Sequence, residues 1–175
     1  MNLVLIGYRG TGKSTVGRAL AAKLGRELIS TDKEVVRRAG RSIPDIVASN
    51  GWDYFRDLES AVCRDLAGKD NLIIDTGGGA ILRQQNVDVL KRNGIMFWLT
   101  AAVDTIAKRI GGDNQRPSLT GTKSFVEEIQ EVLTERWPKY QAASDYTIAT
   151  DGQTIDHLAN LVWREFAASS SRPRP

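Results

Sequence analysis

The feature that most constrains this chain is a glycine-rich segment near its N-terminus, residues 7–14, which reads GYRGTGKS. The segment fits the pattern G-x-x-x-x-G-K-[ST] of the phosphate-binding loop, or P-loop, and it directly follows the apolar run of residues 3–6. A chance match in a chain of this size has a probability on the order of one percent. The pattern therefore predicts a short buried strand, a loop that binds a nucleoside triphosphate, and a helix after it.

Each part of the loop has a chemical role in binding phosphate. The glycines let the loop close so that successive backbone N–H groups point at phosphate oxygens. Lys13 brings a mobile positive charge to the β- and γ-phosphates, and the Ser14 hydroxyl is a ligand for Mg²⁺. The following helix is expected to end at Gly25. The loop residues predicted to bind ATP are Gly10, Thr11, Gly12, Lys13, Ser14 and Thr15.

Length and composition indicate one ordinary globular domain. The chain has 175 residues, of which 41% are hydrophobic and 26% are charged. No apolar run is long enough to cross a bilayer, and the N-terminus enters the first predicted strand at once, so we expect no membrane span and no signal peptide. The single cysteine, Cys63, cannot form an internal disulfide, which fits a cytoplasmic location.

The charge of the chain argues against nucleic acid as a partner. The net charge is only +3, no long run of Lys or Arg occurs, and no aromatic residues alternate with basic ones. The small excess of positive charge is better explained by a few arginines that bind anionic small molecules. No segment looks like a large exposed interface, so we expect a monomer.

Apolar runs of strand length alternate with helical patterns along the chain. This order predicts an α/β fold with a five-stranded parallel sheet and helices on both faces. The predicted strands cover about 2–6, 27–30, 71–75, 95–99 and 145–149. A helical stripe runs through the region before Pro138, and this proline is expected to end or kink that helix.

Two segments fall outside this alternation within a predicted domain of residues 1–168. Residues 31–68 hold several short helices, with Pro44 near a helix start. Residues 111–124 are polar and flanked by glycines, which is typical of a mobile lid, although a plain surface loop is the alternative. Residues 169–175 are expected to form a disordered tail.

Several residues could form a site for a phosphoryl acceptor, although each also has a purely structural interpretation. Asp32 follows the second strand, where it could instead be a helix N-cap. Arg56 and Glu59 are three residues apart on one helix, as in a surface ion pair. The run Gly77-Gly78-Gly79 permits close approach of a ligand, or forms a tight turn. Arg136 precedes Pro138, where it could complement a helix dipole.

Together these residues resemble the shikimate kinase family over nearly the whole chain. The matching motifs are Gly7–Thr15, Asp32 with the later Arg41-Ser42-Ile43-Pro44 segment, Phe55-Arg56-x-x-Glu59, Gly77-Gly78-Gly79-Ala80, Arg109-x-Gly111-Gly112 with Arg116-Pro117, and Arg136-x-Pro138-x-Tyr140. The resemblance implies a P-loop kinase that uses ATP and Mg²⁺. By this resemblance the enzyme transfers the γ-phosphoryl group to the 3-hydroxyl of shikimate, a step on the route to chorismate and the aromatic amino acids.

The resemblance also implies roles at the acceptor. Asp32 would orient or deprotonate the attacking hydroxyl, and it is one of three predicted catalytic residues with Lys13 and Arg116. The two cations would neutralise charge on the transferring phosphoryl group, Arg116 from the lid. The shikimate carboxylate would bind Arg56 and Arg136. The remaining predicted substrate-binding residues are Asp32, Glu59, which would hold Arg56, and the glycines Gly77, Gly78 and Gly79, where the Gly78 N–H would face the substrate.

The resemblance also implies that two further residues contact the adenine base of the nucleotide. Arg109 would stack its guanidinium on the adenine, and Gln153, within the segment 152–154, would close the other side. Arg116 is also predicted to contact ATP.

One position departs from the family pattern. The family usually shows Asp-x-Asp at the end of the second strand, where this chain has Ser30-Thr31-Asp32. We hypothesise that Asp75, at the end of the third strand, contacts the Mg²⁺ shell through water with help from the Ser30 hydroxyl, as Asp32 also would. The alternative is that Asp75 only ends the strand.

Two other functions stay open at this stage. One is another small-molecule kinase of the same build, such as a gluconate or nucleoside monophosphate kinase, against which the triple glycine and Arg136-x-Pro138-x-Tyr140 argue. The other is a catalytically silent relative that binds ATP, for which the Ser30 departure leaves room.

Overall fold

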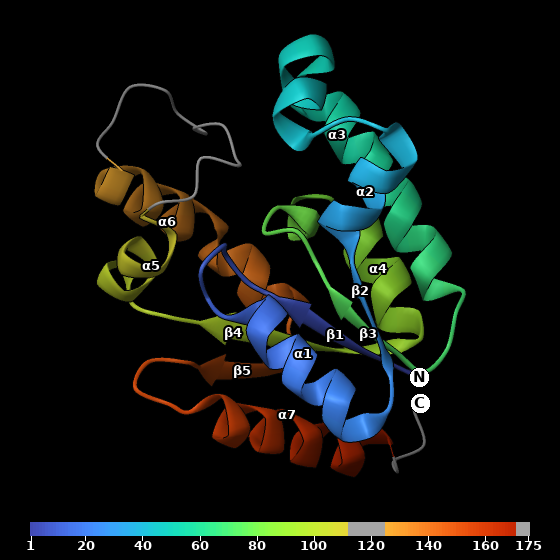
Figure 1. Ribbon diagram of the computed structural model, residues 1–175, viewed down its shortest axis with the longest axis vertical. Coiled ribbons are helices and arrows are strands. Elements are labelled where there is room, and N and C mark those ends of the chain that lie inside the picture. The colour runs from blue at the N-terminus through green and yellow to red at the C-terminus, as the bar shows by residue number, and fades with distance from the viewer. Residues whose placement is uncertain (112–124, 171–175) are drawn as a thin grey trace.

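The computed structural model describes residues 1–111 and 125–170, and these form an α/β domain (Figure 1). The strands are β1 (Asn2–Ile6), β2 (Glu27–Ser30), β3 (Leu72–Asp75), β4 (Gly94–Thr100) and β5 (Tyr146–Ala149). The helices are α1 (Lys13–Leu24), α2 (Thr31–Ala39), α3 (Ile43–Ala67), α4 (Gln84–Arg92), α5 (Val103–Ile110), α6 (Phe125–Ala143) and α7 (Ile155–Ser170), with a 3-10 turn η1 (Ala80–Leu82).

The five strands form one parallel sheet in the order β2-β3-β1-β4-β5, which confirms the predicted fold class. All five predicted strands are present, with ends that differ by at most one residue. The central strand β1 is completely buried, and its side chains alternate between two cores. Leu3 and Leu5 pack toward α1 and α7, whereas Val4 and Ile6 pack toward α3, α4 and α6.

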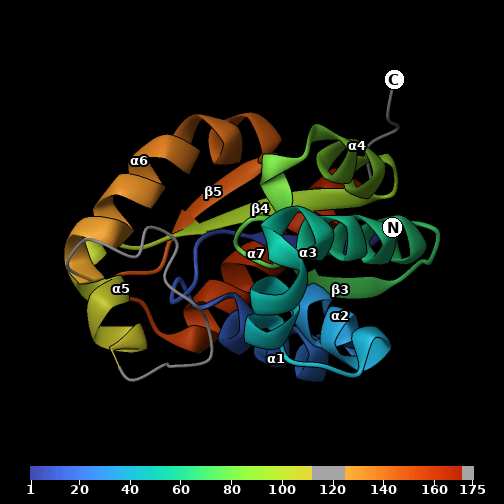
Figure 2. The same ribbon diagram turned by 90° about the horizontal axis from the view of Figure 1, so that it is seen from above.

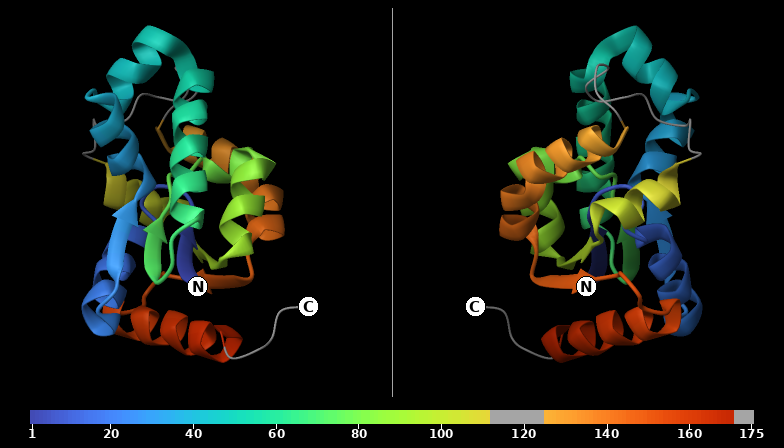
Figure 3. Two further views of the ribbon diagram at one scale, coloured as in Figure 1. Left: turned by 90° about the vertical axis from the view of Figure 1, so that its right-hand side faces the viewer. Right: turned by 90° about the vertical axis from the view of Figure 1, so that its left-hand side faces the viewer.

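The helices leave the carboxyl ends of the strands accessible. Figure 2 shows α5 and α6 at one side of the molecule, and α3 runs from the middle of the view toward the opposite side, where α2 lies. The side views in Figure 3 place α7 opposite the tip formed by α2 and α3. The loops after β1 and β3, and the start of α2, which follows β2 directly, therefore lie between these two groups of helices.

The segment predicted as several short helices, residues 31–68, consists of α2 and α3. Ser42 caps α3 by accepting a hydrogen bond from the Asp45 N–H (3.2 Å), and Pro44 lies in the first turn, as expected. Gly51 interrupts α3 with φ 81° and ψ 171°, a conformation that other residues rarely adopt. The glycine thereby kinks α3.

Two predicted boundaries differ from the structure. Pro138 does not end its helix, because α6 continues to Ala143. The proline is exposed, so the carbonyl that loses its helical partner can bind water, while the buried Arg136 and Tyr140 hold this turn against the core. Helix α7 runs through Ser170, two residues beyond the predicted domain boundary at 168.

The rest of the predicted tail, residues 171–175, lies outside the described residues, as does the predicted lid except for Gly111. Among the helices of residues 1–111 and 125–170, none has both the length and the apolar character needed to span a bilayer.

A buried asparagine connects the start of β1 to the start of β3 and to the segment before it. Asn2 is 1% exposed, its Oδ1 accepts a hydrogen bond from the Leu72 N–H (2.9 Å), and its Nδ2 donates to the Lys69 carbonyl (2.8 Å). The Asn93 side chain also donates to that carbonyl, so only the Leu72 N–H depends on Asn2 alone.

We expect Asn2→Ala to lower the free energy of unfolding by about 1–3 kcal/mol, because it leaves the buried Leu72 N–H without an acceptor. Urea denaturation measures this loss. The control Asn50→Ala removes an exposed amide on α3 and should change the free energy of unfolding by no more than about 0.5 kcal/mol. Equal effects of the two substitutions would contradict the role given to Asn2.

Candidate active site

The P-loop has a backbone that its glycines alone can adopt. Gly7, Gly10 and Gly12 have φ values of 143°, 79° and 96°, all in the region that L residues rarely occupy. A Cβ on Gly7 would also lie 2.4 Å from the Leu99 carbonyl oxygen. Gly12 caps α1, so the first N–H groups of that helix face the space inside the loop. This is the geometry of an anion-binding loop.

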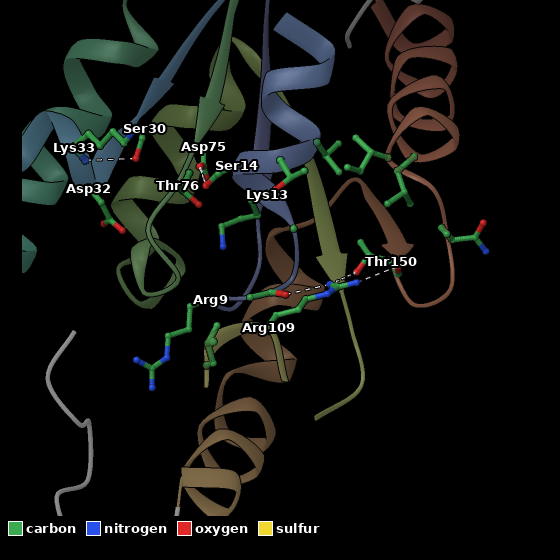
Figure 4. Close-up of a pocket in the computed structure, with 18 of the residues that line it drawn as sticks. Arg9, Lys13, Ser14, Ser30, Asp32, Lys33, Asp75, Thr76, Arg109 and Thr150 are labelled. Atoms are coloured by element: carbon green, nitrogen blue, oxygen red, sulfur yellow. Dashed lines mark hydrogen bonds between the residues drawn. The ribbon is translucent and has the colours of Figure 1, made fainter. Parts of the chain in front are cut away.

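A cavity of about 870 Å³ opens beside this loop (Figure 4). Its size suits a nucleotide. The predicted ATP-binding residues that line it are Gly10, Gly12, Lys13, Ser14, Thr15, Arg109 and Gln153. Thr11 does not line the cavity, because its side chain turns inward and its hydroxyl donates to the Tyr8 carbonyl (2.8 Å). Arg116 lies outside the described residues.

Lys13 and Arg109 bring positive charge to this cavity while they contact the loop itself. The Lys13 ammonium donates to the carbonyls of Gly7 (2.8 Å) and Tyr8 (3.0 Å). The Arg109 guanidinium, at the end of α5, donates to the Gly10 carbonyl (3.1 Å) and to the Thr150 hydroxyl (3.1 Å). Figure 4 shows Arg109 held between the loop and Thr150. The sequence reasoning missed Thr150, whose only signal is a polar residue directly after β5.

Several side-chain oxygens that could bind a metal ion lie close together where β2 and β3 end. The Ser14 hydroxyl donates to Asp75 Oδ2 at 2.5 Å, and Asp75 is 5% exposed (Figure 4). Ser30 is the partner of Asp75 in the parallel register of β2 and β3. The Ser30 hydroxyl also accepts a hydrogen bond from the Lys33 N–H (3.4 Å) and so caps α2.

Asp32 lies in the first turn of α2 and is not its N-cap. The helix begins at Thr31, one residue after β2 ends, so the capping position falls on Ser30. The structural interpretation of Asp32 as the cap is therefore wrong. Asp32 lines the nucleotide cavity and also a second, smaller pocket.

The second pocket encloses about 40 Å³ and is rich in charged groups. It is lined by Tyr8, Arg9, Asp32, Ile43, Trp52, Phe55, Arg56, Gly77, Gly78, Gly79 and Arg136. We call it the acceptor pocket. It contains the predicted substrate-binding residues except Glu59, which lies directly behind Arg56.

Arg56 and Glu59 form a buried ion pair. The Arg56 guanidinium donates to Glu59 Oε2 at 2.6 Å, and the Glu59 side chain is completely buried. The interpretation as a surface ion pair is therefore wrong, because α3 turns this face toward the sheet. Burial raises the pKa of the Glu59 carboxyl, and the charge of Arg56 opposes that rise. The Arg56 guanidinium also lies over the rings of Trp52 (5.5 Å) and Phe55 (5.0 Å).

The triple glycine makes room for these charged side chains. A Cβ on Gly77 would lie 2.5 Å from Asp32 Oδ1 and 2.6 Å from Glu59 Oε1. A Cβ on Gly79 would lie 2.0 Å from an Arg56 nitrogen. The run after β3 is thus more than a tight turn, because any larger residue would displace groups of the acceptor pocket.

Arg136 lies within α6 and not at its end, because the helix continues past Pro138. The interpretation of Arg136 as a charge that complements the dipole at a helix end is therefore wrong. Arg136 is 8% exposed and donates to the Gly78 carbonyl (3.2 Å), to which the Tyr140 hydroxyl also donates. Arg56 and Arg136 thus line one pocket, together with a third arginine, Arg9.

Comparison with known proteins decides the family. The family model described as shikimate kinase matches residues 9–167. The chain belongs to the shikimate kinase family. The shikimate kinase of Nitratidesulfovibrio vulgaris is 45% identical over 150 residues, which cover 84% of this chain and 85% of that relative. The shikimate kinase of Pelotomaculum thermopropionicum is 41% identical, with 92% of each chain covered.

Solved structures agree with this assignment. The shikimate kinase from Acinetobacter baumannii in complex with shikimate matches with a TM-score of 0.91 and 34% identity, over 98% of this chain and 95% of that one. The resemblance drawn from the sequence is confirmed, and the chain is an ATP-dependent phosphotransferase of the shikimate kinase family.

We expect Gly79→Ala to raise the KM for shikimate roughly tenfold or more, because the added methyl group takes the place of the Arg56 guanidinium and so removes a charged hydrogen bond. Steady-state kinetics with each substrate varied in turn measure this effect, and the KM for ATP should stay unchanged. Gly68→Ala is the matched control, because its Cβ would make an ordinary 3.6 Å contact. An unchanged KM for shikimate in Gly79→Ala would contradict the proposed packing of Arg56.

Proposed function

We propose that the chain transfers the γ-phosphoryl group of ATP to the 3-hydroxyl of shikimate, giving 3-phosphoshikimate and ADP. The observation that carries this proposal is the position of Asp32, whose side chain lines both the nucleotide cavity and the acceptor pocket. A carboxylate between a phosphoryl donor and an alcohol is placed to act on the attacking hydroxyl. The family of the chain supports the same reaction.

In this proposal ATP binds the cavity beside the P-loop. The N–H groups at the start of α1 bind the phosphates, and Lys13 turns from the loop carbonyls to the β- and γ-phosphates. Arg109 and Gln153 line the cavity away from α2 and would hold the adenine between them. The guanidinium is already fixed by Gly10 and Thr150, so little of its freedom is lost on binding.

The residues around Ser14 fit a bound Mg²⁺ ion. Within the described residues no three His, Cys, Asp or Glu side chains form a cluster, and Mg²⁺ is typically bound by only one or two protein oxygens together with phosphates and waters. The Ser14 hydroxyl would be a ligand, and Asp75, with Ser30 beside it and Asp32 nearby, would hold water of the metal shell. The ion would supply positive charge to the phosphate oxygens.

Shikimate would bind in the acceptor pocket through its carboxylate. Arg56 and Arg136 offer planar, permanently charged donors that match a carboxylate in geometry. Glu59 and the two aromatic rings beneath Arg56 hold the Arg56 guanidinium in place. The ring hydroxyls then lie toward Asp32, which accepts a hydrogen bond from the attacking one.

Transfer follows from this arrangement of groups. Asp32 orients the 3-hydroxyl and takes its proton as the oxygen attacks the γ-phosphorus, while Lys13 stabilises negative charge on the transferred oxygens. Arg116 would add a third positive group from the predicted lid. The cytoplasmic location and the monomeric state stay predictions from the sequence.

An assay of ADP release with and without shikimate tests the function. We expect release to depend on shikimate and not on gluconate or a nucleoside monophosphate. Asp32→Asn should lower kcat by about 10²–10⁴-fold and leave the Kd for ATP unchanged, because the amide orients a hydroxyl without accepting its proton. Near-normal turnover in Asp32→Asn would reject the role of Asp32, and release that does not respond to shikimate would reject the proposed acceptor.

The metal contact of Asp75 has its own test. We expect Asp75→Asn to raise the Mg²⁺ concentration needed for half-maximal activity, because the site loses the charge that holds water of the metal shell. A titration of activity with Mg²⁺ at saturating ATP measures the shift. Asp88→Asn, an exposed position on α4, is the control and should leave the titration unchanged. A Mg²⁺ requirement equal to that of the parent protein in Asp75→Asn would leave Asp75 with a purely structural role.

A further inference from the structure

The hydroxyl of Tyr8 is a buried polar group that none of the roles above uses. Tyr8 follows Gly7 in the P-loop, is 2% exposed, and packs its ring in a cluster with Ile106 and Ile129. Its hydroxyl makes no hydrogen bond within the described residues. Because a buried hydroxyl without a partner is destabilising, its presence calls for an explanation.

Tyr8 is part of the wall of the acceptor pocket, as is Arg136. Tyr8 lines this pocket together with Arg56 and Arg136. The backbone of Gly78, which accepts hydrogen bonds from Arg136 and Tyr140, lies against Tyr8, since a Cβ on Gly78 would be 3.6 Å from the Tyr8 Cα. Burial raises the pKa of the Tyr140 phenol, and the nearby Tyr8 adds to that rise.

Two of the three other buried polar atoms without partners belong to residues at the same pocket. In residues 1–111 and 125–170, the buried side-chain atoms without a hydrogen-bond partner are Tyr8 Oη, Arg9 Nε, Glu59 Oε1 and Asn86 Oδ1. Tyr8 and Arg9 line the acceptor pocket, and Glu59 Oε1 lies beside Gly77 on its wall. Buried polar groups are normally satisfied, so this concentration indicates that a polar ligand completes the pocket.

We propose that the Tyr8 hydroxyl donates a hydrogen bond to the carboxylate of the bound acceptor, as a third donor beside Arg56 and Arg136. This inference rests on the proposed function. The phenol is neutral, so it adds a directed donor without adding another buried positive charge. Its ring is held by α5 and α6, so the donor is in place before the acceptor binds. Tyr8 would then link the P-loop directly to recognition of the acceptor.

The substitution Tyr8→Phe tests the inference, because it removes the hydroxyl and keeps the ring. We expect the KM for shikimate to rise roughly 3- to 10-fold, as for the loss of one hydrogen bond, with the KM for ATP unchanged. The melting temperature should stay equal or rise, because the free protein loses a buried group that had no partner. An acceptor analogue with a methyl group in place of the carboxylate should be used equally well by the parent protein and by Tyr8→Phe.

Tyr146→Phe is the matched control. The Tyr146 hydroxyl on β5 already has Ser169 as its partner, so its removal should lower the melting temperature and leave the KM for shikimate unchanged. An unchanged KM for shikimate in Tyr8→Phe would overturn the inference while the proposed function stands, and so would a fall in its melting temperature. A parent protein that binds no shikimate would overturn the proposed function and this inference with it.

Discussion

The parallel pairing of β1 with β3 is the interaction on which the candidate active site depends. The pairing runs through Leu5 and Asp75, and the next residue, Thr76, donates both its N–H (3.1 Å) and its hydroxyl (3.0 Å) to the Leu5 carbonyl. Parallel strands end at the same edge of a sheet, so the P-loop after β1 and the glycine run after β3 emerge side by side. The contact between Ser14 and Asp75 follows directly from this register.

The acceptor pocket lies next to this edge, and it can hold several charged side chains because glycines leave room for them. The triple glycine lets Arg56, Asp32 and Glu59 occupy space that a Cβ would fill. A buried ion pair such as Arg56 with Glu59 adds little net stability, because both charges lose water when the chain folds. Its physical effect here is orientation, since it holds the Arg56 guanidinium in place at the wall of the acceptor pocket.

The register of β2 and β3 also gives a physical reason for the departure at Ser30. Ser30 and Asp75 are partners across these strands, so a carboxylate carried by either strand reaches the same neighbourhood beside Ser14. In this chain the acidic side chain stands on β3 and a hydroxyl stands on β2, where the hydroxyl also caps α2. The proposed metal site can therefore keep its negative charge although the carboxylate is carried by β3 and not, as in the family pattern, by β2.

The sequence by itself determined the fold class, the strands and the phosphate-binding loop. These depend on local patterns, namely apolar β-branched runs and glycines with required backbone angles, which are visible along a single segment. It also determined the family, because the motifs keep their order and spacing. For the same reason the predicted ends of the strands were nearly correct.

Only the tertiary structure decided which side chains meet. The burial of Glu59, the place of Arg136 inside α6 and the helix cap at Ser30 all depend on packing between elements far apart in the chain. Thr11 fits the loop motif, yet the folded loop turns its hydroxyl away from the nucleotide cavity. The unpartnered hydroxyl of Tyr8 is likewise invisible in the sequence, because whether a polar group finds a partner is a property of the folded surroundings.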